Sequence, residues 1–242
     1  CGDEREVQVL SADLETLTGR RPVTLLGREW QFRPGAVGSR DWERSRLAAL
    51  YALAQGDAPV VVATADGLMA RTLPPETLRS LAITLEVGGQ AELGALAEQL
   101  LSAGYTRCEQ VEGVGQFALR GGILDVFSPL MDQPVRCEFF DDEIDSMGAF
   151  DPGTQRRTRN VSSARILPAD AERLRSGAAP GAADRYLAAI YPTVTAGVHY
   201  LPPDAVVFLS ESGRVDERVK NTVLQQKQDV EALLSAGVLA GE

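Results

Sequence analysis

Apolar positions near the start of the chain alternate between helical and strand-like spacing. Residues 22–26 and 59–64 are short, continuous apolar runs, and residues 42–54 between them show helical periodicity. A buried strand, a helix and a second buried strand in this order are typical of a parallel sheet in an α/β domain. A first amphipathic helix, with Asp3 as its N-cap, is predicted by the stripe of Val7, Leu10, Leu14 and Leu17.

The pattern changes after residue 81. A strand is predicted at 83–87 and a helix over 93–101, and residues 105–146 then read as short strands joined by Gly, Pro and Asp turns. This arrangement is α+β rather than α/β. We therefore predict boundaries near residues 81 and 168.

The last third of the chain is less regular. Residues 175–184 are rich in Ala, Gly and Ser and are predicted to be a linker. Residues 205–209 are continuously apolar and predict another buried strand, and residues 215–239 show weak helical periodicity.

Charge is distributed unevenly over the 242 residues, whose net charge is −10. Residues 82–168 hold 7 basic and 13 acidic side chains, which argues against a general nucleic-acid-binding surface. No apolar run is long enough to cross a bilayer, and no leader is visible. Three scattered cysteines favour a reducing, cytoplasmic location. The start at Cys1, without Met, predicts a fragment of a longer protein.

Residue types needed for common catalytic sites are scarce. His199 is the single histidine and is interpreted as structural, because no nucleophile motif accompanies it. The chain has no G-x-x-x-x-G-K-[ST] phosphate loop, no C-x-x-C pair and only two lysines, Lys220 and Lys227. We predict no catalytic residue, no metal and no cofactor in this chain.

Three other patterns have weak functional interpretations. Residues 113–118 match a loose dinucleotide fingerprint, but they lead into a strand rather than a helix and favour a turn between strands. The acidic residues within 141–145 favour a turn over a metal site. Arg156, Arg157 and Arg159 form a basic island, which is interpreted as a solvated or interdomain surface, with phosphate contact as the alternative.

The predicted strand at residues 135–140 is the most informative segment. Its alternation places Arg136, Glu138 and Phe140 on the face opposite the core. Arginine and aromatic residues together are typical of protein interfaces. Alternation alone leaves open that Phe140 packs under a loop. Arg120 shares this face if residues 116–120 pair with residues 135–140, and the alternative is that both arginines form weak surface salt bridges. Gly121 and the following glycine predict a bulge.

These strands carry a resemblance to a known family. Matching positions lie in order over about 65 residues, and weaker agreement includes residues 60–64. The sequence resembles the N-terminal UvrB-homology region of the transcription-repair coupling factor (Mfd) family. UvrB proteins are the nearest competitor, but their tyrosine-rich hairpin insertion is missing between Trp30-Gln31-Phe32 and Trp42. The motifs that carry the resemblance are Gly104-Tyr105, Val111-Glu112, Gly115-Gln116-Phe117, Arg120-Gly121-Gly122-Ile123-Leu124-Asp125-Val126-Phe127, Pro134-Val135-Arg136, Glu138-Phe139-Phe140-Asp141-Asp142-Glu143-Ile144-Asp145, Phe150-Asp151, Thr154-Gln155-Arg156 and Leu167-Pro168-Ala169.

The resemblance implies a fold and a partner. The fold would be a degenerate RecA-like (P-loop-type) parallel-sheet domain in two segments, 1–81 and 169–242, with a small α+β domain inserted at 82–168. The inserted domain would recruit UvrA through Arg120, Arg136 and Phe140, a surface that a C-terminal domain masks within the parent protein.

The resemblance also implies what lies outside this chain. The parent protein would be an ATP-dependent DNA translocase that displaces stalled RNA polymerase, with ATP and Mg confined to motor domains elsewhere. This region would itself be catalytically inactive. The alternative is a UvrB-type or superfamily 2 helicase core with nucleotide-dependent DNA binding.

Overall fold

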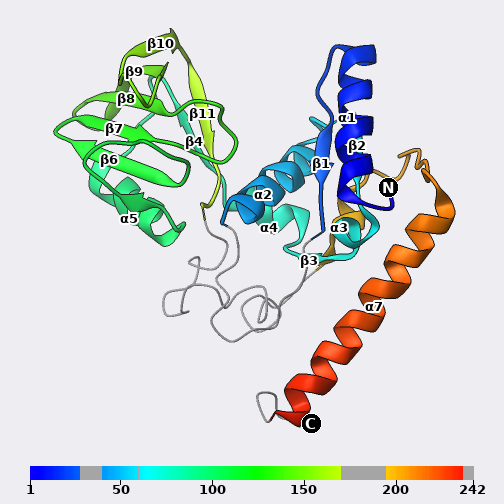
Figure 1. Ribbon diagram of the computed structural model, residues 1–242. Coiled ribbons are helices and arrows are strands. Elements are labelled where there is room, and N and C mark those ends of the chain that lie inside the picture. Colours follow the sequence, from blue (N-terminus) through cyan, green and yellow to red (C-terminus); the bar gives the residue numbers. More distant parts are fainter. Residues whose placement is uncertain (28–39, 59, 170–194, 237–242) are drawn as a thin grey trace. The chain divides into compact units, whose positions relative to one another are not determined.

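The computed structural model describes residues 1–27, 40–58, 60–169 and 195–236, which divide into two compact units. Unit 1 comprises residues 1–37, 49–76 and 191–242, and unit 2 comprises residues 38–48 and 77–190. The architecture is mixed α/β with one multi-stranded sheet (Figure 1). None of the helices in these described ranges is long and apolar enough to cross a membrane.

Unit 1 contains the predicted parallel strands. Strand β1 pairs with β2 in parallel, with Val23 opposite Val61 and Leu25 opposite Ala63, and α2 lies between them in the chain. The strand–helix–strand prediction is therefore confirmed. Helices α2 and α4 cross the boundary between the units. The elements of this part of the chain are α1 (Glu4–Thr18), β1 (Val23–Leu25), α2 (Arg40–Gln55), β2 (Val61–Ala63), α3 (Ala65–Met69), β3 (Arg71–Thr72), α4 (Pro75–Ser80), β12 (Thr195–Ala196), η1 (Gly197–Tyr200) and α7 (Ser212–Ser235).

Helix α1 begins as predicted. The Asp3 carboxylate accepts a hydrogen bond of 2.8 Å from the backbone N–H of Glu6, which satisfies a donor that the first turn leaves unpaired. Gly19 ends the helix with φ of +67°, a conformation that suits glycine. Val7 is the one residue of α1 that is fully buried.

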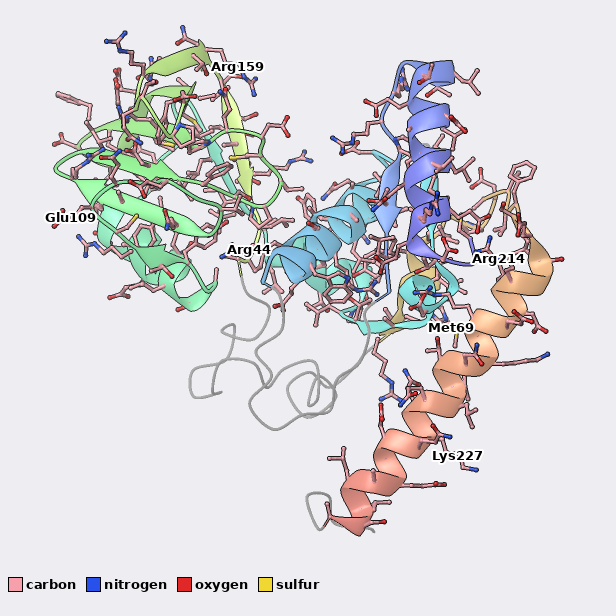
Figure 2. The ribbon with its side chains drawn as sticks, in the orientation of Figure 1. Arg44, Met69, Glu109, Arg159, Arg214 and Lys227 are labelled. Atoms are coloured by element: carbon pink, nitrogen blue, oxygen red, sulfur yellow. The ribbon has the colours of Figure 1, made fainter. Side chains whose placement is uncertain are left out.

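Helix α7 is held to unit 1 by polar contacts near its N-terminal end. Arg218 donates two hydrogen bonds to the buried Asp66 carboxylate on α3, at 2.6 Å and 2.8 Å, and Arg214 pairs with Asp3. None of the residues of α7 is buried. Figure 2 shows Lys227 on the part of α7 that extends away from α3.

The ion pair between Arg218 and Asp66 should contribute to the free energy of unfolding of this chain. Burial raises the pKa of this carboxyl, but hydrogen bonds from Arg218 and Thr64 outweigh burial and hold the pKa below its ordinary value. The stabilisation is therefore present at pH values above the ordinary carboxyl pKa and is lost as pH falls through the lowered pKa. We expect Asp66→Asn to reduce the free energy of unfolding at pH 7 by about 1–2 kcal/mol, less than for a fully buried pair because Arg218 is partly exposed.

Urea denaturation followed by circular dichroism at pH 7 and near pH 3 measures this effect. The difference between wild type and Asp66→Asn should shrink at the lower pH. Asp216→Asn is the matched control on α7, because its ion pair with Lys220 is exposed and should contribute little. An Asp66→Asn variant as stable as wild type at pH 7 would show that Arg218 does not stabilise unit 1.

The prediction of a buried strand at residues 205–209 is wrong. These residues form no strand, and the side chains of Val206, Val207, Phe208 and Leu209 are 77%, 64%, 88% and 65% exposed. An apolar run becomes a strand only where another strand pairs with it, and no described residue pairs with this one. The predicted linker at 175–184 and the Trp30–Phe32 motif lie outside the described residues.

Unit 2 is built around a six-stranded sheet in the order β10–β9–β8–β7–β6–β5 (Figure 1). Neighbouring strands are antiparallel except β5 and β6, which are parallel. A separate antiparallel pair, β4 and β11, completes the unit. The elements are β4 (Ile83–Glu86), α5 (Leu93–Ser102), β5 (Thr106–Arg107), β6 (Gln116–Arg120), β7 (Ile123–Val126), β8 (Val135–Phe140), β9 (Glu143–Phe150), β10 (Arg157–Asn160) and β11 (Ser163–Ile166).

The main core of unit 2 lies on one face of this sheet. Helix α5 and the β4–β11 pair bury their apolar side chains against that face. Tyr105 is fully buried, and its hydroxyl donates a hydrogen bond to the backbone oxygen of Leu167. The opposite face, which we call the outer face, is therefore free of α5. The inward residues of the central strands include Phe117, Leu124, Val126, Val135, Cys137, Ile144 and Met147.

A tight turn sets the register between β6 and β7. Arg120 lies opposite Ile123, so Gly121 and Gly122 form a two-residue hairpin turn and not the predicted bulge. Gly121 has φ of +58°, which glycine adopts without strain. The irregularity lies instead in β9, where the pairing with β8 shifts between Glu138 and Phe139. Alternation along β8 continues through this shift.

A candidate partner-binding face on the sheet of unit 2

Register aligns four residues across the outer face. Ala118 on β6, Asp125 on β7, Arg136 on β8 and Gly148 on β9 lie opposite one another in successive strands. The two charged residues therefore have a small residue on each side, Ala118 next to Asp125 and Gly148 next to Arg136. Directly opposite residues in antiparallel strands have Cβ atoms about 4.5–5.5 Å apart, within reach of an ion pair.

Asp125 joins the two arginines that alternation predicted for this face. Arg136 donates hydrogen bonds from Nε and Nη2 to the two oxygens of the Asp125 carboxylate, at 2.7 Å and 2.8 Å. Arg120 donates from Nη2 to Oδ2 at 2.7 Å. Arg120 is a diagonal neighbour of Asp125, within reach of a long side chain.

The predicted grouping of Arg120 and Arg136 is confirmed, but the direct pairing of their strands is not. Strand β7 lies between β6 and β8, and it supplies the carboxylate that links them. The Asp125 side chain is 1% exposed, so these are not the weak surface salt bridges of the alternative interpretation. Removal of one partner from a buried charge is costly, and the three residues therefore form one structural unit.

Two further contacts hold the Arg136 side chain. Its guanidinium lies over the ring of the buried Phe150, 4.7 Å from the ring centroid. Its Nη2 also donates to the side-chain oxygen of Gln155 at 3.5 Å. Hydrogen bonds to Asp125 raise the pKa of the Arg136 guanidinium, although partial burial opposes them. With 22% of its side chain exposed, Arg136 keeps a restricted contact with solvent.

Phe140 lies on the same face of β8, two alternations beyond Arg136. It is 76% exposed, so the alternative that it packs under a loop is wrong. A rise of about 3.3 Å per residue places it roughly 13 Å from Arg136 along the strand. A phenylalanine this exposed on an ordered strand has no role in the core of unit 2.

A second polar group lies between these residues. Glu138 accepts a hydrogen bond of 2.8 Å from the Ser146 hydroxyl and pairs with Arg157 at 3.6 Å. Gly148 leaves room for Arg157, because a Cβ at that position would overlap the arginine side chain. The outer face thus carries two linked sets of charges and, at the end of β8, an exposed aromatic ring.

The basic island lies at the edge of the sheet. Arg156, Arg157 and Arg159 are exposed, and Arg159 lies on strand β10 (Figure 2). Arg157 is engaged by Glu138 and Ser146, which reduces its availability for phosphate.

Other candidate chemistry remains weak in the structure. Residues 113–115 lead into strand β6, as expected, and not into a helix. His199 is exposed, and its Nδ1 accepts a hydrogen bond from the backbone N–H of Ala196. Burial raises the pKa of the Cys137 thiol to about 12, which suppresses the reactive thiolate. Within the described ranges, no group of three His, Cys, Asp or Glu side chains could hold a metal ion.

Sequence reasoning did not assign a role to Asp125. Aspartate is disfavoured in strands, and Asp125 stands between Leu124 and Val126, which both point into the core. An acidic residue at an outward position between two apolar residues, with two outward arginines on nearby strands, is the pattern that could have indicated an ion pair.

The face lies within a region that matches a known family. Residues 83–171 match the UvrB interaction domain family. The chain is 37% identical over 175 residues to the transcription-repair-coupling factor of Myxococcus xanthus, covering 69% of this chain and 15% of that protein. It is 27% identical over 277 residues to the transcription-repair-coupling factor of Bacillus subtilis, covering 96% and 23%. The corresponding protein of Escherichia coli is 39% identical over 143 residues, covering 58% and 12%. The matches thus span less than a quarter of each relative's length.

Proposed function

We propose that this chain, which carries a UvrB interaction domain and is homologous to the N-terminal region of transcription-repair-coupling factors, is a repair-recruitment module that binds UvrA. Arg120, Arg136 and Phe140 on the outer face of unit 2 make the contact. The observation that carries the proposal is the exposed Phe140 on the strand that also presents Arg136. Aromatic and arginine side chains are the residues that dominate binding energy at protein interfaces.

The wider role of the parent protein is part of the same proposal. Within it, this module would serve an ATP-dependent translocase that moves on DNA and displaces stalled RNA polymerase. Unit 1 would be a degenerate RecA-like domain without nucleotide chemistry, and its parallel β1–β2 pair with α2 between the strands supports that reading. A C-terminal domain of the parent would mask the outer face until the ATPase motor engages.

Phe140→Ala tests the proposal with little risk to folding. Because the side chain is largely exposed, its removal should leave unit 2 folded and weaken UvrA binding by about 1–3 kcal/mol. Isothermal titration calorimetry of the chain with purified UvrA measures the change.

Leu101→Ala is the matched control. Leu101 is 46% exposed on α5, on the other side of the sheet, and its loss should leave UvrA binding unchanged. Equal affinities for wild type and a folded Phe140→Ala variant would overturn the proposal. DNA-stimulated ATP turnover by this chain would instead favour a helicase core.

A further inference from the structure

We infer that Asp125 is a positioning residue that holds Arg120 and Arg136 as one preorganised pair, directed at carboxylates on an acidic protein surface. The inference rests on the proposed function, because it concerns how the same face recognises its partner. Asp125 itself does not touch the partner and acts on binding only by holding the two arginines.

The first step is that Asp125 is buried where no solvent can replace its partners. Its side chain is 1% exposed, and it accepts three hydrogen bonds from the two guanidinium groups. A buried carboxylate must be paired, so the positions of both arginines are coupled to one anchor. Arginine side chains that are not anchored in this way lose rotamer freedom when a partner orders them.

The second step is that the arginines retain donors after this pairing. Each guanidinium has five N–H groups, and Arg136 uses Nε and Nη2 for its hydrogen bonds whereas Arg120 uses Nη2. In the described part of the chain, the Nη1 groups of both residues donate no hydrogen bond. Two positive charges against one negative charge leave the cluster with a net charge of about +1.

The third step identifies the chemistry of the partner. The cluster is a positive site in a segment with 7 basic and 13 acidic side chains, so a partner carboxylate is attracted here and repelled by most of the surrounding surface. Planar guanidinium groups with unused donors match carboxylate geometry. The fixed arginine pair therefore selects a partner group by its position and by its negative charge.

Asp125→Asn tests the inference, because asparagine keeps the shape of the side chain and removes its charge. We expect UvrA to bind this variant roughly tenfold more weakly. If Asp125 merely competed with the partner for the arginines, its neutralisation would strengthen binding, and that result would overturn the inference. Unchanged affinity would overturn it as well.

A double-mutant cycle separates positioning from a general loss of structure. Asp125→Asn combined with Arg136→Ala should weaken binding by less than the product of the single effects, because both changes act on the same contact. The effects of Asp125→Asn and Phe140→Ala should multiply, since Phe140 lies roughly 13 Å from Arg136 along β8. Multiplicative effects in both cycles would reject positioning.

The outcomes also distinguish this inference from the proposed function. If Phe140→Ala and Arg136→Ala both leave UvrA binding intact, the outer face is not the binding surface and the proposed function fails. If those variants bind weakly and Asp125→Asn binds as wild type does, only the positioning role fails. Urea denaturation of each variant shows which are folded at the temperature of the titration.

Discussion

Phe150→Ala should lower the free energy of unfolding of unit 2 by about 3–5 kcal/mol, the range for removing a buried phenylalanine. Phe150 is 0% exposed and packs with Val111, Ala118 and Phe127 in a small apolar cluster on the outer face, separate from the main core. Its ring also supports the guanidinium of Arg136. The variant loses buried apolar area, leaves a cavity and removes the ring that supports the Arg136 guanidinium.

Phe150→Leu is the matched control for this experiment. Leucine fills most of the cavity but has no ring face, so the loss of stability should be at most about 1.5 kcal/mol. Urea denaturation followed by circular dichroism gives both values. A Phe150→Ala variant that loses no more stability than Phe150→Leu would show that the small cluster does not contribute to the stability of unit 2.

The local structure of the outer face was readable from the sequence. Alternation along residues 135–140 placed Arg136 and Phe140 on one face, and the structure confirms it. Period-two alternation is a property of the strand itself and needs no knowledge of its neighbours. The same holds for α1, where Asp3 and Glu6 specify the cap locally.

Features that depend on neighbouring strands could not be read in the same way. Alternation does not reveal which strand lies between β6 and β8, so the role of Asp125 was missed. The apolar run at 205–209 shows a capacity for burial, but a strand also requires a pairing partner, and the structure leaves this segment exposed. The Gly121–Gly122 turn was misassigned because its type follows from the opposition of Arg120 and Ile123.

Arg136→Ala should affect both stability and recognition. It removes two of the three hydrogen bonds to Asp125 and leaves that buried carboxylate with Arg120 alone. Loss of one partner of a fully buried pair costs about 3–5 kcal/mol; because Arg136 is partly exposed and Arg120 remains, we expect about 2–3 kcal/mol here. Urea denaturation at pH 7 measures this loss.

Binding separates the two contributions of the arginine. Arg120→Ala is the matched variant, because Arg120 is half exposed and makes a single hydrogen bond to Asp125, so it should cost less stability. Both variants should weaken UvrA binding by about 1–3 kcal/mol when calorimetry is done below their unfolding transitions. If Arg136→Ala unfolded more readily yet bound UvrA as tightly as wild type, the cluster would serve the stability of the sheet alone, and Phe140 would have to act without it.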